Sequence, residues 1–537
     1  MKTPENLPLA VCWSIAGSDS GAGAGLQADL RAFDALGVHG CTAVAALTAQ
    51  NSVAVPRIDA VATDLLGAQL AALADDLPPA AIKTGLLGSA ANLQCVAQAV
   101  DRLRHARPGM ALVVDPVLRA STGAAFADPA LLQAYREHLL PRTTLLTPNR
   151  AEAAALLGWP PLATNADVEA AAETLQALGC QAVVITGGDA RDGLGAAHSL
   201  DYACTPQASG WLALPRVATP HHHGTGCVFA SSAAAAMARG FVAMEAVVLA
   251  KMATTEALRH GRPAGAGAGP VRPQPGFALR SDNLPRFGLP GQEPDSLLAP
   301  PPAFAPLRHP AMGLYAVVDS AAWVDRVLAA GVRTVQLRIK DLAHPRLRQE
   351  IQQAVAATAA AGAQLFVNDH WQAAIALAAN RPHVAVHLGQ DDLAAAGPEG
   401  LAAIARAGLG LGVSTHAFWE VARAWALQPS AIACGPIHPT HSKAMPWLPQ
   451  GAANLAFWAA LLPLPVVGIA GMTPTRAREA LAVGAAGAAV ITAVTEAADP
   501  EAAIAALQQA VAAGQADWGS LPRPAPPGLP QSTLRLP

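Results

Sequence analysis

The stretch GLYAVVDSAAWVDRVLAAGVRTVQLR, residues 313–338, contains a β-type run, an alanine-rich helical run and a second β-type run. The same alternation continues to residue 492 and gives eight β-type runs with helical stretches between them. Eight such units in about 200 residues are typical of a (β/α)8 TIM barrel, whose functional residues lie at the carboxyl ends of the strands. A doubly wound parallel sheet is the alternative that this pattern leaves open.

Charged and amide side chains gather at the carboxyl ends of these runs. Gln336, Arg338 and Lys340 alternate at the end of the second run, so all three point to one face. Two cations and an amide on one face can bind a pyrophosphate. Asp369 follows the third run and Asp392 the fourth, so two carboxylates can hold a Mg²⁺ ion that bridges a pyrophosphate leaving group.

The first half of the chain also alternates between β-type runs and helical stretches. This order predicts an α/β domain with a doubly wound parallel sheet, whose ligands lie beyond the carboxyl ends of the strands. Asp115, Asn149, Glu152 and Gly187 lie at those ends. They are therefore candidate ligand-binding residues.

A short glycine-containing turn, Gly224-Thr225-Gly226-Cys227, precedes a long alanine-rich helix. Small residues let successive backbone N–H groups face an anion, and the helix dipole favours negative charge at that end. Such an anion hole can stabilise a phosphoryl group during transfer. Cys227 at the helix N-terminus is expected to have a lowered pKa and to serve as a base. A buried helix cap with an inert cysteine is the alternative.

Composition and charge exclude several classes of protein. Of 537 residues, 52% are hydrophobic and 14% are charged, which argues against a disordered chain. The formal net charge of −3 argues against nucleic-acid binding. Seven cysteines without a CxxC pair suit a reducing compartment. We recognise no signal peptide or membrane span and expect a cytoplasmic protein without membrane or nucleic-acid partners.

Lysine is rare in this chain and occurs only at positions 2, 83, 251, 340 and 443, so arginine supplies nearly all of the positive charge. Because a compact ammonium behaves differently from a planar guanidinium, each internal lysine is a candidate functional group.

Proline, glycine and alanine dominate residues 263–312, where no sustained periodicity occurs, and this composition predicts a linker. We therefore expect one domain at residues 8–262 and a second at residues 313–515. A proline-rich tail is expected at residues 516–537.

An ordered series of motifs runs through the first domain: IAGSDSGAG (15–23), AALTAQNS (45–52), KTGLLGS (83–89), VVDPVL (113–118), TPNRAEAAAL (147–156), ITGGD (185–189) and HGTGC (223–227). The series resembles the hydroxymethylpyrimidine/phosphomethylpyrimidine kinases of thiamine biosynthesis, in the ribokinase superfamily. The resemblance covers nearly all of residues 10–260. It implies a doubly wound sheet that binds ATP near the GTGC helix.

Individual roles follow from this resemblance. Cys227 corresponds to the base that deprotonates the substrate hydroxymethyl group, and Gly224 to Gly226 correspond to the anion hole. Gln50 corresponds to the glutamine that hydrogen-bonds the aminopyrimidine, with Gly17 and Leu86 in the same pocket. The implied ATP and Mg²⁺ side holds Asp115, Asn149, Glu152, Gly187, Gly224, Thr225 and Gly226, with Glu152 as a metal ligand. Thr186 stands where many members have a lysine.

A second ordered series runs through the other domain: QLRIK (336–340), ND (368–369), HLGQDD (387–392), GVSTH (412–416), GPIHPTHSK (435–443), GIAGM (468–472) and VITAVTEA (490–497). It resembles thiamine-phosphate synthase across essentially all of residues 313–500. The resemblance implies that Asp369 and Asp392 are Mg²⁺ ligands and that Arg338, Lys340 and Ser414 are catalytic. The implied substrate-binding residues are Gln336, Arg338, Lys340, Asn368 and Ser414 on the pyrimidine diphosphate side, and Thr440, Ser442, Lys443, Gly471, Ile491 and Thr492 on the thiazole phosphate side.

The two resemblances together predict a bifunctional enzyme of thiamine biosynthesis. Its expected partners are hydroxymethylpyrimidine and its phosphates, thiazole phosphate and ATP, with Mg²⁺ as cofactor; homo-oligomerisation is left open. One alternative is a pyridoxal-type kinase fused to a thiazole tautomerase-like barrel. Gln50 argues against the first half of that alternative, and the QLRIK, ND and GQDD motifs argue against the second. Another alternative is a sensor of thiamine precursors in which one domain is inactive.

Overall fold

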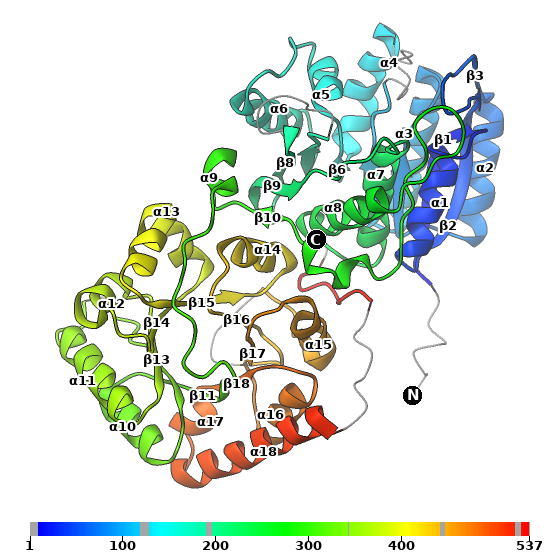
Figure 1. Ribbon diagram of the computed structural model, residues 1–537. Helices are drawn as coiled ribbons and strands as arrows, with labels where there is room; N and C mark the ends of the chain where they lie inside the picture. Colours follow the sequence, from blue (N-terminus) through cyan, green and yellow to red (C-terminus); the bar gives the residue numbers. More distant parts are fainter. Residues whose placement is uncertain are drawn as a thin grey trace. The chain divides into compact units, whose positions relative to one another are not determined.

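The computed structural model describes residues 9–118, 128–188, 196–341, 343–440, 446–520 and 528–535. The chain divides into two compact units, one of residues 1–297 with residues 535–537 and one of residues 298–534. Each unit contains its own sheet (Figure 1).

The first unit contains a ten-stranded sheet in the order β10-β9-β8-β7-β6-β5-β4-β1-β2-β3. The block from β7 to β2 is parallel, whereas β3 and the segment from β8 to β10 pair antiparallel. This arrangement confirms the predicted doubly wound sheet. The strands are β1 (Val11–Asp19), β2 (His39–Ala49), β3 (Arg57–Ala60), β4 (Ala81–Thr84), β5 (Ala111–Val114), β6 (Leu145–Leu146), β7 (Val183–Ile185), β8 (His198–Cys204), β9 (Ser209–Pro215) and β10 (Arg286–Phe287).

Two adjacent helices of this unit are buried on nearly all sides. Alanine and serine fill most of α7 between Val228 and Met237, and these small side chains let it pack closely against β4, β5 and α1. Within α8, Glu245, Lys251 and Glu256 are also buried. The helices of the unit are α1 (Gly25–Ala35), α2 (Thr63–Asp76), α3 (Ala90–Ala106), α4 (Pro129–Ala134), α5 (Arg150–Leu157), α6 (Asn165–Ala177), α7 (Thr225–Ala238) and α8 (Ala243–Arg259). The short helix α9 (Pro294–Leu298) lies at the division between the units.

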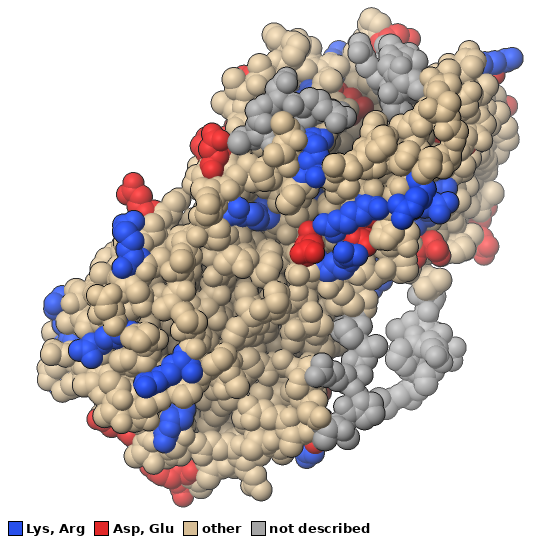
Figure 2. All heavy atoms as spheres, in the orientation of Figure 1, with Lys and Arg blue, Asp and Glu red and all other residues tan. Residues whose placement is uncertain are grey.

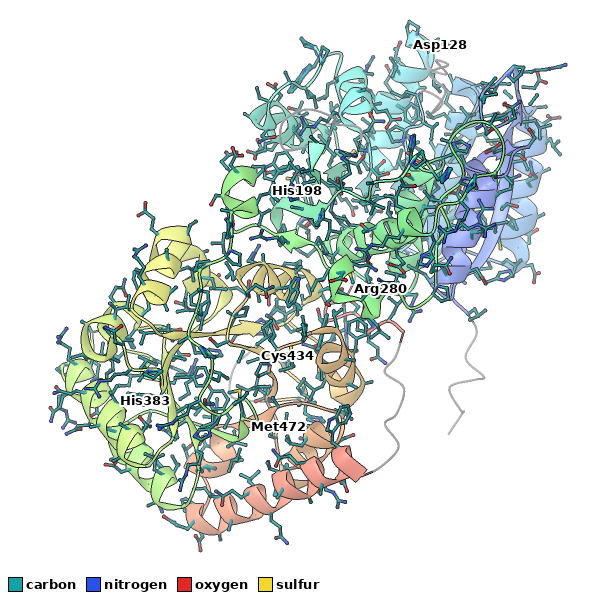
Figure 3. All side chains as sticks on the ribbon, in the orientation of Figure 1. Asp128, His198, Arg280, His383, Cys434 and Met472 are labelled. Atoms are coloured by element: carbon teal, nitrogen blue, oxygen red, sulfur yellow. The ribbon has the colours of Figure 1, made fainter. Side chains whose placement is uncertain are left out.

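The residues that follow α8 differ from the linker expected at 263–312. Phe277 and Phe287 are buried, and β10 pairs with β9. The buried carboxylate of Glu256 accepts hydrogen bonds from Arg280 Nη1 and Asn283 Nδ2, both at 3.1 Å (Arg280 is labelled in Figure 3). Apolar residues at irregular spacing thus attach this segment to α8 and β9, and the division of the chain falls at residue 297 instead of 262.

We predict that a fragment of residues 1–297 is markedly more stable than a fragment of residues 1–262. The shorter fragment would expose the apolar surface under Phe277 and Phe287 and would remove two partners of buried Glu256. Loss of partners by a buried polar group alone costs about 1–3 kcal/mol. Urea unfolding followed by circular dichroism measures the difference. Equal unfolding free energies would contradict this boundary.

The second unit is a closed barrel with the strand order β11 to β18, and β18 pairs with β11 to complete it. All neighbouring strands are parallel, which confirms the predicted TIM barrel. Tyr315, Phe366 and small residues such as Ala385, Ala433 and Ala489 fill its interior. The strands are β11 (Gly313–Val318), β12 (Thr334–Leu337), β13 (Gln364–Asn368), β14 (Val384–Leu388), β15 (Gly410–Thr415), β16 (Ala431–Cys434), β17 (Val466–Ile469) and β18 (Gly487–Val490).

Helices follow the barrel strands: α10 (Ala321–Ala329), α11 (Leu347–Ala360), α12 (Trp371–Ala378), α13 (Gln390–Arg406), α14 (Phe418–Leu427), α15 (Gly451–Leu461), α16 (Pro474–Ala482), α17 (Thr492–Thr495) and α18 (Pro500–Ser520). The expected tail at 516–537 begins inside α18. Its later part also packs on the barrel, because Gln531 and Asn454 exchange two hydrogen bonds of 2.7 and 2.9 Å.

On the face drawn in Figure 2, Lys and Arg lie singly or in small groups, with acidic residues interspersed. Among the described residues, no helix combines the length and the apolar character needed to cross a membrane.

Candidate active sites

A cavity of about 1020 Å³ lies in the first unit at the carboxyl ends of the parallel strands, and the N-terminus of α7 borders it. Most residues predicted for the kinase site line this cavity: Gly17, Gln50, Leu86, Asp115, Asn149, Glu152, Gly224, Thr225, Gly226 and Cys227. Gly187 is not among the lining residues, although Thr186 and Gly188 are. The Gly187 N–H donates to Asp201 Oδ1 at 3.0 Å, and an added Cβ would approach Leu200 O to 2.0 Å, so this glycine packs against β8.

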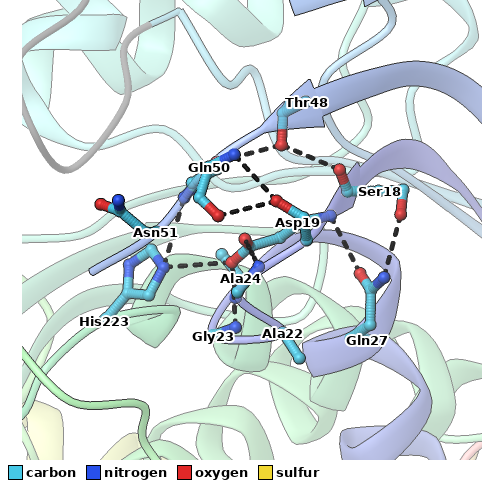
Figure 4. Close-up of polar contacts among 12 residues, drawn as sticks. Ser18, Asp19, Ala22, Gly23, Ala24, Gln27, Thr48, Gln50, Asn51 and His223 are labelled. Atoms are coloured by element: carbon cyan, nitrogen blue, oxygen red, sulfur yellow. Dashed lines mark hydrogen bonds and ion pairs between the residues drawn. The ribbon is translucent and has the colours of Figure 1, made fainter. Parts of the chain in front are cut away.

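Asp19, at the end of β1, organises the turn that precedes α1 (Figure 4). Its carboxylate accepts hydrogen bonds from the N–H groups of Gly21, Gly23 and Ala24 at 2.8–2.9 Å. His223 Nε2 lies 3.2 Å from Asp19 Oδ2. Burial alone would raise the pKa of Asp19, but the hydrogen bonds from His223 and the backbone lower it.

The two glycine-containing motifs lie against each other around His223. A Cβ on Gly23 would approach His223 Cδ2 to 2.1 Å, and a Cβ on Gly224 would approach Gly23 O to the same distance. Gly224 also has a left-handed φ of +85°. His223 Nε2 lies 3.3 Å from Gln50 Nε2, so the predicted pyrimidine-binding glutamine is beside the turn that begins α7.

A buried ion pair lies beneath this turn. Lys83 Nζ of β4 is 3.0 Å from both carboxylate oxygens of Asp29, and neither side chain is exposed to solvent. The hydroxyls of Ser14 and Ser231 donate to the same carboxylate at 2.5 and 2.6 Å. Burial alone would lower the pKa of Lys83, but the negative charge of Asp29, and also that of Asp115, raises it. The ammonium is therefore permanent.

Cys227, the candidate base, and Asp115, a candidate metal ligand, both lie near this ammonium. Burial raises the pKa of Asp115 to about 6, Lys83 at 3.6 Å lowers it, and Asp29 raises it. Asp115 Oδ2 is buried and has no hydrogen-bond partner among the described residues. Asp115 borders the cavity, and its carboxylate, whose ion-pair partner is Lys83, is of the ligand type that a divalent cation prefers.

Cys227 differs from the expectation of a lowered pKa. The thiol keeps partial exposure to the cavity, but protein encloses its other sides, and burial raises its pKa to about 12. Lys83 and a hydrogen bond with the backbone of Gly25 lower the pKa, whereas Asp29 and Asp115 raise it. The helix N-terminus therefore does not suffice to make a resting thiolate.

Asn149 and Glu152 form a capping box at the start of α5, with hydrogen bonds of 2.9 and 3.0 Å. This contact fixes both side chains where they border the cavity. A second buried ion pair, Lys251 Nζ to Asp201 Oδ2 at 2.7 Å, also lines it. We did not assign either buried pair from the sequence, although the scarcity of lysine singled out Lys83 and Lys251.

We predict that Lys83→Met destabilises the first unit by about 3–5 kcal/mol, because the buried Asp29 carboxylate loses its counter-charge. The double variant Asp29→Asn/Lys83→Met should recover part of this loss. Arg57→Met breaks the solvent-exposed pair with Asp59 and serves as the control with little effect. Chemical denaturation measures all three variants. A Lys83→Met variant as stable as the control would refute the importance of the buried pair.

In the second unit, β12 ends at Leu337, so Gln336 is the only one of the three residues expected to share a face that lies within this strand. Gln336 is buried and donates to Tyr315 Oη at 2.7 Å inside the barrel. Arg338 is half-buried and Lys340 is exposed, while Ile339 between them is buried. Gln336 is thus held by the barrel core, and the two cations lie nearer the rim.

The two predicted acidic residues are brought together at this end of the barrel. Asn368 Nδ2 donates to the carboxylate of Asp369, whose backbone has a left-handed φ of +62°. Burial raises the pKa of Asp369 to about 6; the charge of Asp392 and a hydrogen bond between the two carboxyl groups add to this, while Arg338 lowers it. A cation would relieve this repulsion, so the pair fits Mg²⁺. No cluster of three or more metal-ligating side chains occurs among the described residues.

Ser414 of β15 is half-buried, and its Oγ atom lies 2.8 Å from His387 Nε2. Burial, with a smaller effect of Arg338, lowers the pKa of His387 to about 4. The sequence did not single out His387, although it begins the HLGQDD motif.

The thiazole phosphate side is described in part. Gly471 has a φ of +66°, and an added Cβ would approach Pro439 O to 2.6 Å, so this glycine lies against the loop that leads to Thr440. Ile491 and Thr492 follow β18 at the start of α17. Ser442 and Lys443 lie outside the described residues.

The comparisons with known proteins divide the chain in the same way. Residues 19–272 match the family described as phosphomethylpyrimidine kinase, and residues 314–494 match the family described as thiamine monophosphate synthase. A hydroxymethylpyrimidine/phosphomethylpyrimidine kinase from Synechococcus elongatus is 44% identical over 265 residues, which cover 49% of this chain and 97% of that protein. A thiamine-phosphate synthase from Rhizobium etli is 50% identical over 189 residues, which cover 35% of this chain and 89% of that protein.

A relative from Oryza sativa spans both units. It is described as a probable thiamine biosynthetic bifunctional enzyme, chloroplastic, and is 31% identical over 490 residues, which cover 89% of this chain and 84% of that protein. The fold and the two sites thus define a kinase domain and a barrel synthase domain joined in one chain. The chain belongs to the family of bifunctional thiamine biosynthetic enzymes. The family resemblance seen in the motifs is thereby confirmed.

Proposed function

We propose that the first unit uses ATP to phosphorylate 4-amino-5-hydroxymethyl-2-methylpyrimidine and then its monophosphate, which gives the diphosphate. The second unit couples this diphosphate to 4-methyl-5-(2-phosphoethyl)thiazole and releases thiamine phosphate and pyrophosphate. The observation that carries the proposal is the pairing of two matched sites in one chain. One has the turn at Cys227 beside Asp115, and the other has the acidic pair beside Arg338.

In the first unit, the N–H groups of Gly224 to Gly226 would face the transferring phosphoryl group at the positive end of α7. Gln50 would bind the polar edge of the pyrimidine ring. Cys227 would accept the hydroxymethyl proton, and the permanent ammonium of Lys83 is the cation that favours its thiolate. Asp115 and Glu152 would hold Mg²⁺, which neutralises phosphate charge when bound.

In the second unit, Arg338 and Lys340 would bind the diphosphate. Asp369 and Asp392 would hold Mg²⁺, which stabilises charge on the departing pyrophosphate when bound. Electron release from the aminopyrimidine weakens the bond between the methylene carbon and the pyrophosphate oxygen. The thiazole nitrogen then forms a bond to that carbon, and the electron pair of the broken bond leaves with pyrophosphate.

The cysteines support the compartment that we propose. All seven are free thiols, and five of them, Cys12, Cys41, Cys180, Cys204 and Cys434, are buried hydrophobic groups. Such a set suits a reducing environment, so the proposed site of action is the cytoplasm.

We predict that Cys227→Ala lowers phosphorylation at least about 100-fold, because general-base catalysis contributes that much or more. Coupling of supplied pyrimidine diphosphate should be unchanged. Since the pKa of Cys227 is raised to about 12, the thiolate fraction grows about tenfold per pH unit below that value. The wild-type phosphorylation rate should therefore rise with pH between about 6 and 9, as a coupled ADP-release assay can measure. A flat profile with a small Cys227→Ala effect would exclude the base.

We predict that Asp369→Ala lowers coupling by orders of magnitude and leaves phosphorylation intact. The variant removes one carboxylate of the candidate Mg²⁺ pair. Because the pKa of Asp369 is raised to about 6, its carboxyl is protonated below that pH, and wild-type coupling should decline as the pH falls through about 6. Assays with purified diphosphate, thiazole phosphate and varied Mg²⁺ measure both effects. Asp391→Ala, which removes the exposed neighbouring carboxylate, is the matched control. Coupling that survives both EDTA and Asp369→Ala would contradict metal assistance.

A further inference from the structure

Ser414, near the end of β15, is the one predicted pyrimidine-site residue whose side chain carries a hydroxyl. Two side chains that no motif role covers contact it from neighbouring elements. The Nε2 atom of His387, in β14, lies 2.8 Å from Ser414 Oγ. The Nε2 atom of Gln390, in α13, donates to the backbone oxygen of Ser414 at 2.8 Å. His387 therefore holds the hydroxyl of Ser414, and Gln390 holds its backbone.

Both contacting side chains are themselves fixed. Only 6% of His387 is exposed, and its ring packs edge-on against Phe366. In the pairing of β14 with β13, His387 lies opposite Asn368. An added Cβ on Gly412 would approach His387 Nδ1 to 2.7 Å. The absence of a side chain at position 412 thus leaves the space that the imidazole ring fills.

Gln390 is fixed from its other end. Arg423 Nη1 of α14 donates to Gln390 Oε1 at 3.1 Å, and Arg423 is 6% exposed. A buried guanidinium that donates to an amide oxygen determines which way the amide points. The amide N–H₂ of Gln390 is therefore directed at the carbonyl of Ser414.

We propose that His387 and Gln390 are positioning residues for Ser414 in the coupling reaction. His387 fixes the rotation of the hydroxyl, and Gln390 fixes the backbone at the end of β15. In either tautomer of His387, one hydrogen-bonding direction of the hydroxyl is committed to the ring, and the directions not used there would be available to the substrate. The inference rests on the proposed coupling function of the second unit and adds two residues to its site.

The pairing has a consequence that separates positioning from general structural support. If His387 acts through the Ser414 hydroxyl, removing that hydroxyl removes most of what His387 contributes. A histidine that only filled the barrel would contribute equally with or without the hydroxyl. A double-mutant cycle on coupling therefore distinguishes the two roles.

The experiment measures kcat and KM for coupling of purified pyrimidine diphosphate and thiazole phosphate by full-length variants. His387→Leu should lower kcat/KM at least about tenfold, which is the scale expected when a buried hydrogen bond is lost. His387→Gln, which keeps a polar group at the reach of Nε2, should retain activity within about threefold of wild type. In a Ser414→Ala background, His387→Leu should cost no more than about twofold further. Gln390→Leu should lower kcat/KM as His387→Leu does.

His383→Gln is the matched control (Figure 3 labels His383). His383 is also buried, but it lies just before β14, at the other end of the strand from His387, and its Nε2 is 3.3 Å from Val355 O. It should leave coupling within about twofold of wild type. Phosphorylation by the same preparations and their thermal unfolding report on folding. If His387→Leu does not fold, His387→Asn, whose amide is too short to reach Ser414 Oγ, takes its place in the cycle.

Three outcomes would overturn the inference. The first is wild-type coupling in the folded His387→Leu or His387→Asn variant. The second is an equal loss from that variant with and without the Ser414 hydroxyl. The third is a wild-type enzyme that phosphorylates but forms no thiamine phosphate, which would also overturn the proposed function of the second unit. The first two leave that function intact, so the two failures are distinguishable.

Discussion

Parallel pairing of β-strands is the constraint on which both active sites depend, because it brings the carboxyl ends of successive strands to one edge. In the first unit, β1, β4 and β5 are neighbours, and Asp19, Lys83 and Asp115 come from their ends or from the residues beside them. In the second unit, β12 to β15 are neighbours in the same way. Residues far apart in the chain thus converge without any long-range motif of their own.

Buried charge is handled differently at the two sites. Beneath the turn at α7, the ammonium of Lys83 is neutralised within the protein by Asp29, whose carboxylate also accepts from two serine hydroxyls. At the barrel rim, burial raises the pKa of Asp369 to about 6, and the nearby carboxyl group of Asp392 adds to this effect. In the first unit, groups of the protein itself neutralise the buried charge. In the second unit, two neighbouring carboxyl groups are unfavourable together when both are ionised, and a bound cation would offset this cost.

The sequence predicted both folds because strand–helix alternation is a local pattern. Most residues that it predicted for the kinase site line the cavity, because they occur in contiguous motifs. It could not predict the contacts of Asp29 or His387, since Ser14, Ser231 and Ser414 reach them only in three dimensions. The prediction of a lowered pKa for Cys227 was wrong, because a sequence reveals a helix N-terminus but not the burial of the thiol by surrounding residues. The segment after α8 was mistaken for linker because its buried residues, such as Phe277 and Phe287, have no regular spacing.

The central claim is that one chain carries both sites and performs both steps. Its most direct test supplies the full-length enzyme with hydroxymethylpyrimidine, thiazole phosphate, ATP and Mg²⁺ and quantifies thiamine phosphate by mass spectrometry. The account predicts that thiamine phosphate forms and that Cys227→Ala abolishes it unless pyrimidine diphosphate is supplied. An enzyme that forms none from either starting material, or a Cys227→Ala variant that forms it from the unphosphorylated pyrimidine at the wild-type rate, would contradict the account.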